Sequence, residues 1–287
     1  MTGFIQPHAL DELWFHTGTA CNLACPFCLE GSKPGDGRLE RLRLRDVVPF
    51  IEEALDLGVR QFSFTGGEPF VVKEFVDILA HASERRPCLV LTNATDPLLH
   101  RLDEIERLCR APSPVSFRVS LDHPDAARHD AGRVLVGRHL PGDRQTEAPG
   151  VQRREPFRGP VEAPDSPPRV EAAYRAILRD HGLPEDLRLV AFPDFDVPGS
   201  RRQVPEITED CMTRYHTEET RRAFMCAFSK MVVKQDGRMR VYACTLVDDD
   251  PSYDLGSSLA QAMPQRIGLR HQRCYACFQS GASCSEL

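Results

Sequence analysis

The most constraining feature of the chain is the regular alternation of strand-like and helical segments through its first 131 residues. Short apolar runs of the strand type are separated by segments whose apolar residues recur at helical spacing. Strands separated by helices in this order pair in parallel through right-handed crossovers, which predicts an α/β barrel or a doubly wound sheet. The expected strands are 13–17, 61–65, 88–92 and 115–121, and the expected helices are 45–57, 75–82 and 97–109.

The alternation stops over residues 132–170, where about half of the residues are Arg, Pro or Gly and no periodic pattern persists. A break of this length far exceeds the usual connection inside an α/β unit. Three interpretations are open: a disordered insertion or lid, a segment translated in a locally shifted frame, or order that the pattern does not reveal. The alternation returns with a helix from Glu171 and a strand over 187–192.

A C-terminal unit is expected over residues 206–287, after a first unit of residues 1–205. Within it, an Asp-Gly turn joins two strand-like runs, 230–234 and 238–243, which predicts a β-hairpin. Five cysteines surround this hairpin: Cys226, Cys244, Cys274, Cys277 and Cys284.

Composition narrows the class of protein. The net charge of −6 and the isoelectric point near 5.9 give no reason to expect binding to nucleic acid or to a membrane surface. No run approaches the ~20 apolar residues of a membrane span, and the N-terminus lacks the layout of a signal peptide, so a cytoplasmic protein is expected. In a reducing compartment, 11 cysteines indicate metal binding or redox chemistry in preference to disulfides.

Three cysteines with CxxxCxxC spacing, Cys21, Cys25 and Cys28, follow the first expected strand, and Phe27 precedes the third. Cysteine thiolates are the usual ligands of iron–sulfur clusters. Three protein ligands for four irons would leave one iron open to another molecule. A zinc loop that uses the same cysteines, with His16 as the fourth ligand, is the alternative.

A second motif, Gly66-Gly67-Glu68-Pro69, directly follows the second expected strand. Paired glycines let the backbone approach a ligand closely, and a carboxylate at this place can accept hydrogen bonds from an ammonium group. A pair of glycines after a strand can also be a simple turn.

Polar residues stand at the ends of the next two expected strands. Asn93 follows the third strand, and Ser120 and Asp122 lie at the end of the fourth. A parallel barrel presents its active-site groups at these strand ends. For Ser120 and Asp122, a turn with local side-chain capping is the alternative.

The CxxxCxxC loop with its aromatic residue, together with the GGEP stretch at the next strand end, resembles the radical S-adenosylmethionine (SAM) superfamily. The resemblance spans residues 10–131 and 171–200 and implies a partial (β/α)6 barrel whose fourth helix and fifth strand fall in 132–170. It implies that the three loop cysteines hold a catalytic 4Fe–4S cluster whose open iron binds SAM. Reductive cleavage of SAM then yields a 5′-deoxyadenosyl radical that abstracts hydrogen from the substrate.

The same resemblance implies roles for the strand-end residues. The GGEP stretch, residues 66–69, contacts the amino group of SAM in this family, and Phe27 belongs to the cluster loop. Positions similar to Asn93, Ser120 and Asp122 contact the ribose or carboxylate of SAM, or the substrate.

The C-terminal cysteines resemble the SPASM and twitch appendages of radical SAM enzymes, which carry auxiliary 4Fe–4S clusters. Cys226 and Cys244 flank the hairpin, and Cys274 and Cys277 form a CxxC pair, so the four can converge on one metal centre. The cysteines are too few for two fully ligated clusters, so we expect one, with Cys284 as a substitute ligand. Zinc and free buried thiols are the alternatives.

The leading hypothesis is a radical SAM enzyme that acts on a peptide or a small molecule, with an auxiliary cluster assisting and flavodoxin or ferredoxin as the reducing partner. No catalytic residue is assigned. The alternative is a non-catalytic iron–sulfur or zinc-binding electron-transfer module, against which the setting of Glu68 argues. Cys88 and Cys109 lie on apolar faces and are expected in the core.

Overall fold

The structure is a computed structural model, and its strands form two sheets. The described residues are 1–25, 28–108, 110–121, 150–154, 167–184, 186–192 and 203–280.

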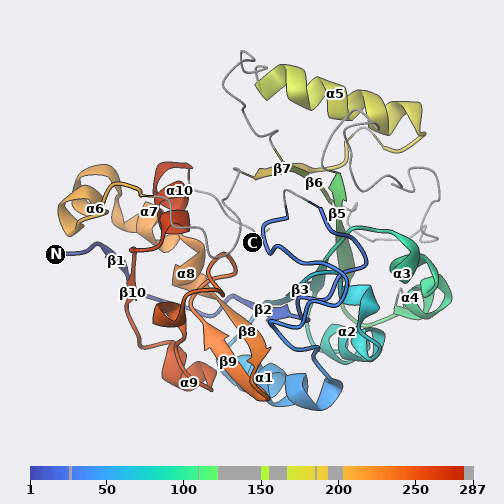
Figure 1. The fold of residues 1–287 in the computed structure, drawn as a ribbon, viewed down its shortest axis with the longest axis horizontal. Coiled ribbons are helices and arrows are strands. Elements are labelled where there is room, and N and C mark those ends of the chain that lie inside the picture. Colours follow the sequence, from blue (N-terminus) through green and yellow to red (C-terminus); the bar gives the residue numbers. More distant parts are fainter. Residues whose placement is uncertain are drawn as a thin grey trace.

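An eight-stranded sheet lies at the centre of the molecule (Figure 1). Its order is β7-β6-β5-β4-β3-β2-β8-β9, and all neighbours are parallel except β8 and β9. Strands β2 to β7 lie side by side in chain order, as in a (β/α) barrel, whereas the strand order of a doubly wound sheet reverses at a switch point. The strands are β2 Glu12–His16, β3 Gln61–Thr65, β4 Cys88–Thr92, β5 Val115–Leu121, β6 Gly150–Arg154, β7 Leu189–Phe192, β8 Ser229–Gln235 and β9 Arg238–Tyr242.

Among the described residues, helices connect the successive strands from β2 to β5 and connect β6 to β7, and they lie outside the sheet (Figure 1). Helix α1 packs against α2, and α2 packs against α4. These helices and the strands between them confirm the predicted α/β alternation, although the single helix expected over 97–109 is divided into α3 and α4. The first helices are α1 Leu44–Asp56, η1 Pro69–Val71, α2 Phe75–Ser83, α3 Asp96–Leu99, α4 Leu102–Leu108 and α5 Pro167–Asp180.

The C-terminal part surrounds the predicted hairpin with short helices. A two-stranded antiparallel sheet joins β1 near the N-terminus to β10 near the other end of the chain. The remaining elements are β1 Phe4–Ile5, α6 Glu209–Tyr215, α7 Glu218–Arg222, α8 Met225–Phe228, η2 Pro251–Tyr253, α9 Leu259–Ala262, β10 Ile267–Gly268 and α10 Gln272–Ser280.

The hairpin β8–β9 extends the main sheet and does not form a sheet of its own. Strand β8 pairs in parallel with β2, and residues Glu12 to Phe15 lie opposite Ser229 to Val232. The turn has positive φ at both Asp236 and Gly237, the conformation of the tight hairpin turn that an Asp-Gly pair favours. The expected C-terminal unit is therefore continuous with the barrel sheet at this strand.

Strand β6 lies inside the segment 132–170, where the sequence showed no pattern. It pairs with β5 on one side and with β7 on the other, so it occupies the place of the fifth barrel strand. Only Val151 among its five residues is strongly apolar, which leaves no alternation for a sequence pattern to reveal. Backbone pairing with two neighbours defines this strand. The residues between β5 and β6, and those from 155 to 166, lie outside the described residues.

The main core lies between the sheet and the helices α1 and α2. All five side chains of β2 are buried, as expected for a parallel strand that is covered on both faces. The ring of Phe15 stacks on Phe64 at 5.6 Å, and Phe75 of α2 meets Phe64 edge to face. Cys88 is part of this core, as predicted, whereas Cys109 lies outside the described residues. The packed core fixes the carboxyl ends of β2, β3 and β4, where the motif residues lie.

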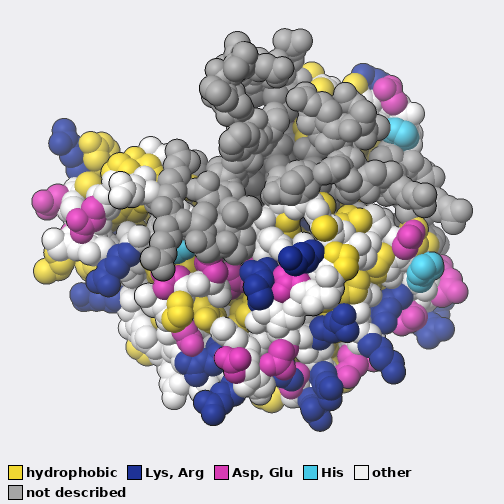
Figure 2. Space-filling model, in the orientation of Figure 1, with side chains coloured by type: hydrophobic (Ala, Val, Ile, Leu, Met, Phe, Trp, Pro, Cys, Tyr) yellow, Lys and Arg dark blue, Asp and Glu magenta, His cyan; other side chains and the backbone are white. Residues whose placement is uncertain are grey.

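The surface carries mixed charges. On the face drawn in Figure 2, Lys and Arg side chains intermingle with Asp and Glu over the described part of the molecule. Among the helices of the described residues, none has the length and apolar character needed to cross a bilayer.

Candidate metal and cofactor site

The cysteine loop leaves β2 and runs beside the GGEP stretch that leaves β3. Backbone hydrogen bonds continue the pairing of the two strands: Gly67 N–H donates to Gly18 C=O at 2.9 Å, and Glu68 N–H donates to Ala20 C=O at 3.1 Å. The two motifs are therefore held side by side, directly next to Cys21.

Both glycines of the motif are required by this close approach. A Cβ atom on Gly67 would lie 2.3 Å from Ala20 O, and one on Gly66 would lie 2.5 Å from Thr17 Oγ1. Gly66 also has φ +149°, a conformation that L side chains rarely adopt. The close approach of these glycines to a ligand stays a prediction, and their close neighbours among the described residues include Thr17 Oγ1 and the backbone of Ala20.

Glu68 lies under this junction and is only 1% exposed. Its carboxylate accepts hydrogen bonds from Thr92 Oγ1 at 2.9 Å, from Asn93 N–H at 2.8 Å and from Phe70 N–H at 3.1 Å. Burial raises the pKa of Glu68 to about 7, although these three donors act in the opposite direction. Glu68 thus ties the end of β3 to the end of β4, and Pro69 behind it begins the short helix η1.

Asn93 connects the end of β4 to the cysteine loop. Its Nδ2 group donates to Asn22 Oδ1 at 3.1 Å and lies 3.8 Å from Cys21 Sγ. Thr95 completes the cluster, because its hydroxyl donates to Asn93 Oδ1 at 2.6 Å and accepts from Asn22 Nδ2 at 2.9 Å. Asn22 and Thr95 were not predicted as site residues. The only sequence feature that pointed to them was their position, inside the cysteine loop and just after a strand end.

The three loop cysteines are free thiols that are each partly exposed. Cys28 N–H donates to Cys25 C=O at 3.0 Å, which closes a turn between them. Burial raises the pKa of Cys21 to about 11, and nearby Glu68 and Cys28 act in the same direction. A loop of three such soft, partly exposed donors fits an iron–sulfur cluster. Phe27 lies outside the described residues.

The remaining strand-end predictions concern β5. Ser120 lies near the carboxyl end of this strand, opposite Gln152 of β6, and is half-buried. Because Thr92 lies opposite Val119, Ser120 follows at the same sheet edge as Asn93. Asp122 lies outside the described residues, so its place at this edge remains a prediction.

Three of the C-terminal cysteines are buried near one another. Cys226 lies on α8, Cys244 follows β9, and Cys274 lies on α10. Burial raises the pKa of Cys226, and Cys244 and Cys274 are close enough to add to the effect. Cys277 is partly buried one turn further along α10, and Cys284 lies outside the described residues. The sequence-predicted thiols Cys226, Cys244 and Cys274 thus come together from three elements.

A buried lysine accompanies these thiols. Lys230 Nζ donates to Cys226 C=O and Ser229 C=O, both at 2.8 Å. Burial lowers the pKa of Lys230 to about 8, while Cys226 and Cys244 act in the opposite direction. A cation at this place would offset the negative charge of thiolate ligands. Lys230 was not predicted as a site residue, because a lysine in a hairpin strand is usually exposed.

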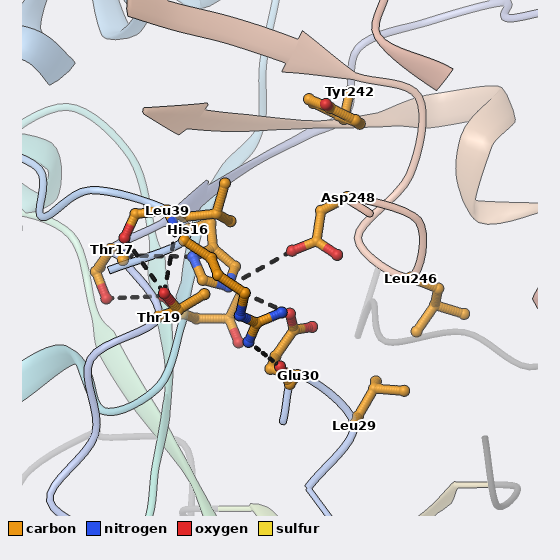
Figure 3. A network of polar contacts seen from close by, with 12 residues as sticks. His16, Thr17, Thr19, Leu29, Glu30, Leu39, Tyr242, Leu246 and Asp248 are labelled. Carbon is orange, nitrogen blue, oxygen red and sulfur yellow. Dashed lines mark hydrogen bonds and ion pairs between the residues drawn. The ribbon is translucent and has the colours of Figure 1, made fainter. Parts of the chain in front are cut away.

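A further buried cluster joins the end of β2 to the C-terminal part. His16 Nε2 lies 3.5 Å from Glu30 Oε2 and 3.8 Å from Asp248 Oδ2, and Figure 3 shows both carboxylates pointing toward the ring. The other ring nitrogen, Nδ1, accepts from Gly18 N–H at 3.2 Å. His16 is the fourth ligand expected in the zinc alternative, and its two ring nitrogens face Gly18 N–H and these carboxylates.

Comparisons with known proteins agree with this geometry. The profile of the radical SAM superfamily matches residues 15–140. The chain is 36% identical over 112 residues to a GTP 3′,8-cyclase of Synechococcus sp. (strain CC9902), a match over 37% of this chain and 30% of that protein. It is 37% identical over 94 residues to a PqqA peptide cyclase of Granulibacter bethesdensis, a match over 32% of this chain and 24% of that protein. The chain therefore spans less than a third of the length of either relative.

Solved structures show the same fold over a larger share of the chain. Streptococcus suis SuiB bound to S-adenosylmethionine superposes with a TM-score of 0.58, covering 97% of this chain and 69% of that one at 12% sequence identity. SuiB without that ligand gives a TM-score of 0.56. At this identity the likeness concerns the fold alone. Residues 15–140 therefore match the radical SAM superfamily, and the SuiB structures share the fold of the chain.

Proposed function

We propose that this chain is a radical SAM enzyme that cleaves SAM reductively and abstracts hydrogen from a peptide or a small-molecule substrate. The observation that carries the proposal is the junction of the cysteine loop with Glu68 and Asn93. It places three thiols and a buried carboxylate at the carboxyl edge of a parallel sheet, where such folds bind ligands.

The loop cysteines would hold the cluster. When bound there with SAM, a 4Fe–4S cluster supplies the electron for reductive cleavage of the sulfonium. A tetrahedral zinc site with bonds of about 2.3 Å needs sulfurs about 3.8 Å apart. Among the described residues, no three cysteine sulfurs lie within 4.8 Å of one another, which supports a larger cluster over a single zinc ion.

Glu68 would receive the ammonium group of SAM. A carboxylate offers about four lone-pair sites, and Glu68 uses three of them. The fourth would accept from SAM once the junction above this buried group opens. A nearby cation favours the ionised form of a carboxyl group and so offsets the burial that raises the pKa of Glu68. Asn93, Ser120 and Asp122 are proposed to contact SAM or the substrate, and Phe27 to pack beside the cluster.

The C-terminal thiols would hold one auxiliary 4Fe–4S cluster. Cys226, Cys244 and Cys274 come together in the structure, which supports this role. Cys277 is proposed as the fourth ligand, and Cys284 as its substitute. Binding requires the thiols to lose protons, so the raised pKa values couple metal binding to proton release. Lys230 would then neutralise part of the thiolate charge.

Two kinds of substrate are supported. SuiB has been solved with the precursor peptide SuiA, and one relative is a PqqA peptide cyclase, which supports a peptide. Another relative is a GTP 3′,8-cyclase, which supports a small molecule. Reductive cleavage needs an external electron, for which we propose flavodoxin or ferredoxin.

Anaerobic reconstitution tests the proposal. The protein should bind about eight irons per chain, four for each cluster, and should release methionine and 5′-deoxyadenosine when SAM and a strong reductant are added. The triple variant C21A/C25A/C28A should keep about half of the iron and release neither product. A fully loaded wild-type protein that yields no 5′-deoxyadenosine would reject the proposal.

A further inference from the structure

One buried arginine connects the two groups of cysteines. Arg273 precedes Cys274 on α10 and is only 2% exposed. Its Nη2 group donates to Leu29 C=O at 3.1 Å, and Leu29 directly follows Cys28. Its Nη1 group donates to Leu246 C=O at 2.5 Å.

The second of these contacts leads to a cysteine sulfur. Leu246 N–H donates to Cys244 Sγ at 3.3 Å, so the same residue contacts both the thiol and the guanidinium. A continuous series of hydrogen bonds therefore runs from Cys244 through Leu246 and Arg273 to the residue beside Cys28. One planar side chain fixes two loops from opposite ends of the chain.

Buried carboxylates lie close to this arginine. Leu29, whose C=O accepts from Arg273 Nη2, directly precedes the buried Glu30 in the chain. Asp248 lies beside Glu30 around the same His16 ring (Figure 3). A buried guanidinium is costly without such partners.

His16, Glu30 and Asp248 could in principle hold a metal ion, because their ligand atoms lie within 4.8 Å of one another. The hydrogen bond from Gly18 N–H to His16 Nδ1 places the ring proton on Nε2, the nitrogen that faces the carboxylates. A metal ligand needs that nitrogen unprotonated. The guanidinium of Arg273, bound to the carbonyl of the residue before Glu30, supplies positive charge beside this group without a metal ion.

We propose that Arg273 is a positioning residue that fixes the N-terminal cysteine loop against the C-terminal cysteine group and sets the electrostatic environment of the N-terminal loop. The inference rests on the proposed function, because it assumes a cluster at that loop. A lysine would keep the charge but could not hold both carbonyls in one planar fork.

The test compares Arg273→Met and Arg273→Lys with the matched control Arg86→Met. Arg86 also donates to two backbone carbonyls, those of Val59 and Arg85, but it lies before β4, at the opposite end of the strands from the cysteine loop. Each protein is reconstituted anaerobically, and its iron content, its electron paramagnetic resonance (EPR) spectrum after reduction and its midpoint potentials are measured.

We expect R273M to keep iron at the N-terminal loop, but with an altered EPR line shape and a lower midpoint potential, because loss of a positive charge disfavours reduction. R273K should change the line shape with a smaller shift of potential, and R86M should match the wild type. If R273M fails to fold, the line shape of R273K decides: a change supports the inference and an unchanged spectrum overturns it.

The inference and the proposed function fail in different ways. Wild-type spectra and potentials in R273M and R273K, with iron present at the loop, overturn the inference alone. A wild-type protein without iron at the loop rejects the proposed function. A divalent metal other than iron that the wild type binds and D248N does not bind would show a metal site in place of the arginine partner, and would also overturn the inference.

Discussion

The two groups of cysteines differ in their surroundings, although both consist of free thiols. Cys21, Cys25 and Cys28 are partly exposed and lie beside the polar residues that follow β3 and β4. Cys226 and Cys244 are buried, with a buried lysine next to them.

This difference suggests different tasks. A partly exposed group with unfilled acceptor capacity nearby can admit another molecule, whereas a closed group is suited to a fully ligated cluster. The N-terminal loop is therefore the proposed place of chemistry, and the C-terminal group the proposed auxiliary site.

The largest effect is expected from Gly67→Ala. The added Cβ would lie 2.3 Å from Ala20 O, so the cysteine loop must move away from the GGEP stretch. We expect iron at the C-terminal group to remain, 5′-deoxyadenosine formation to fall by about 100-fold or more, and overpacking to cost about 1–3 kcal/mol of unfolding free energy. Product analysis and iron counting measure the effect.

Gly37→Ala is the matched control for that variant. Gly37 also lies between the cysteine loop and α1, but a Cβ atom there meets nothing within 4 Å. It should behave as the wild type. Full activity of G67A would show that the close packing of the two motifs does not matter for the reaction.

Cys226→Ala and Cys88→Ala test whether the buried C-terminal thiols bind metal. Both side chains are buried, so both truncations should cost on the order of 1–2 kcal/mol of unfolding free energy. C226A should lose the iron of the C-terminal group and keep the iron of the N-terminal loop, which supports SAM cleavage. C88A should keep both. Equal iron in the two variants would make Cys226 a core thiol like Cys88.

Glu68→Gln separates cluster binding from SAM binding. The variant keeps the shape of the side chain but removes the charge proposed to receive the ammonium group. Iron content should not change, while the affinity for SAM should fall by about 10-fold or more, since hydrogen bonds to charged groups contribute about 1.5–3 kcal/mol. Equilibrium binding of SAM to the loaded protein measures this, and unchanged affinity would contradict the role of Glu68.

The same carboxyl group predicts a pH dependence of stability in the metal-free protein. Burial raises the pKa of Glu68 to about 7, so between its unfolded value and this value the folded state binds more protons than the unfolded state. The free energy of unfolding should therefore receive a contribution that falls as the pH rises from about 4.5 to about 7, by on the order of 3 kcal/mol. Denaturant unfolding of the wild type and E68Q across this range tests the sign, because E68Q should lack this contribution.

The smallest effect is expected from Thr95→Val. The change removes the hydroxyl that links Asn93 to Asn22 but keeps the volume of the side chain. We expect a loss of about 1 kcal/mol of unfolding free energy and a SAM affinity lowered a few-fold, with iron unchanged. Thermal unfolding measures the first value and SAM titration the second. A loss of iron would mean that the hydrogen bonds among Asn22, Asn93 and Thr95 support the cysteine loop directly.

The sequence predicted the parts of the fold that local pattern encodes. Strands β3, β4 and β5 lie where the apolar runs indicated, and the Asp-Gly turn forms the expected hairpin. Strand β6 was not predicted, because only one of its residues is strongly apolar and it pairs with strands that are distant in the sequence. The addition of β8 to the barrel sheet is likewise a long-range pairing that no local pattern shows.

The residues of the candidate site also divide into those that the sequence predicted and those that only the folded chain shows. The motifs identified the loop cysteines and Glu68, because residue type and spacing carry their chemistry. Arg273, Lys230 and Asp248 could not be found, because a charged residue in a sequence is usually exposed and only the folded chain shows that these are buried and paired.

The proposed function requires that three thiolates hold the N-terminal cluster and leave one of its irons open to SAM. The most direct test is the EPR spectrum of the reduced C226A/C244A/C274A variant, which should retain only that cluster, recorded with and without SAM. We expect a cluster signal whose g-values shift when SAM is added. A signal that SAM leaves unchanged, or a colourless, redox-silent ion at the loop, would contradict it.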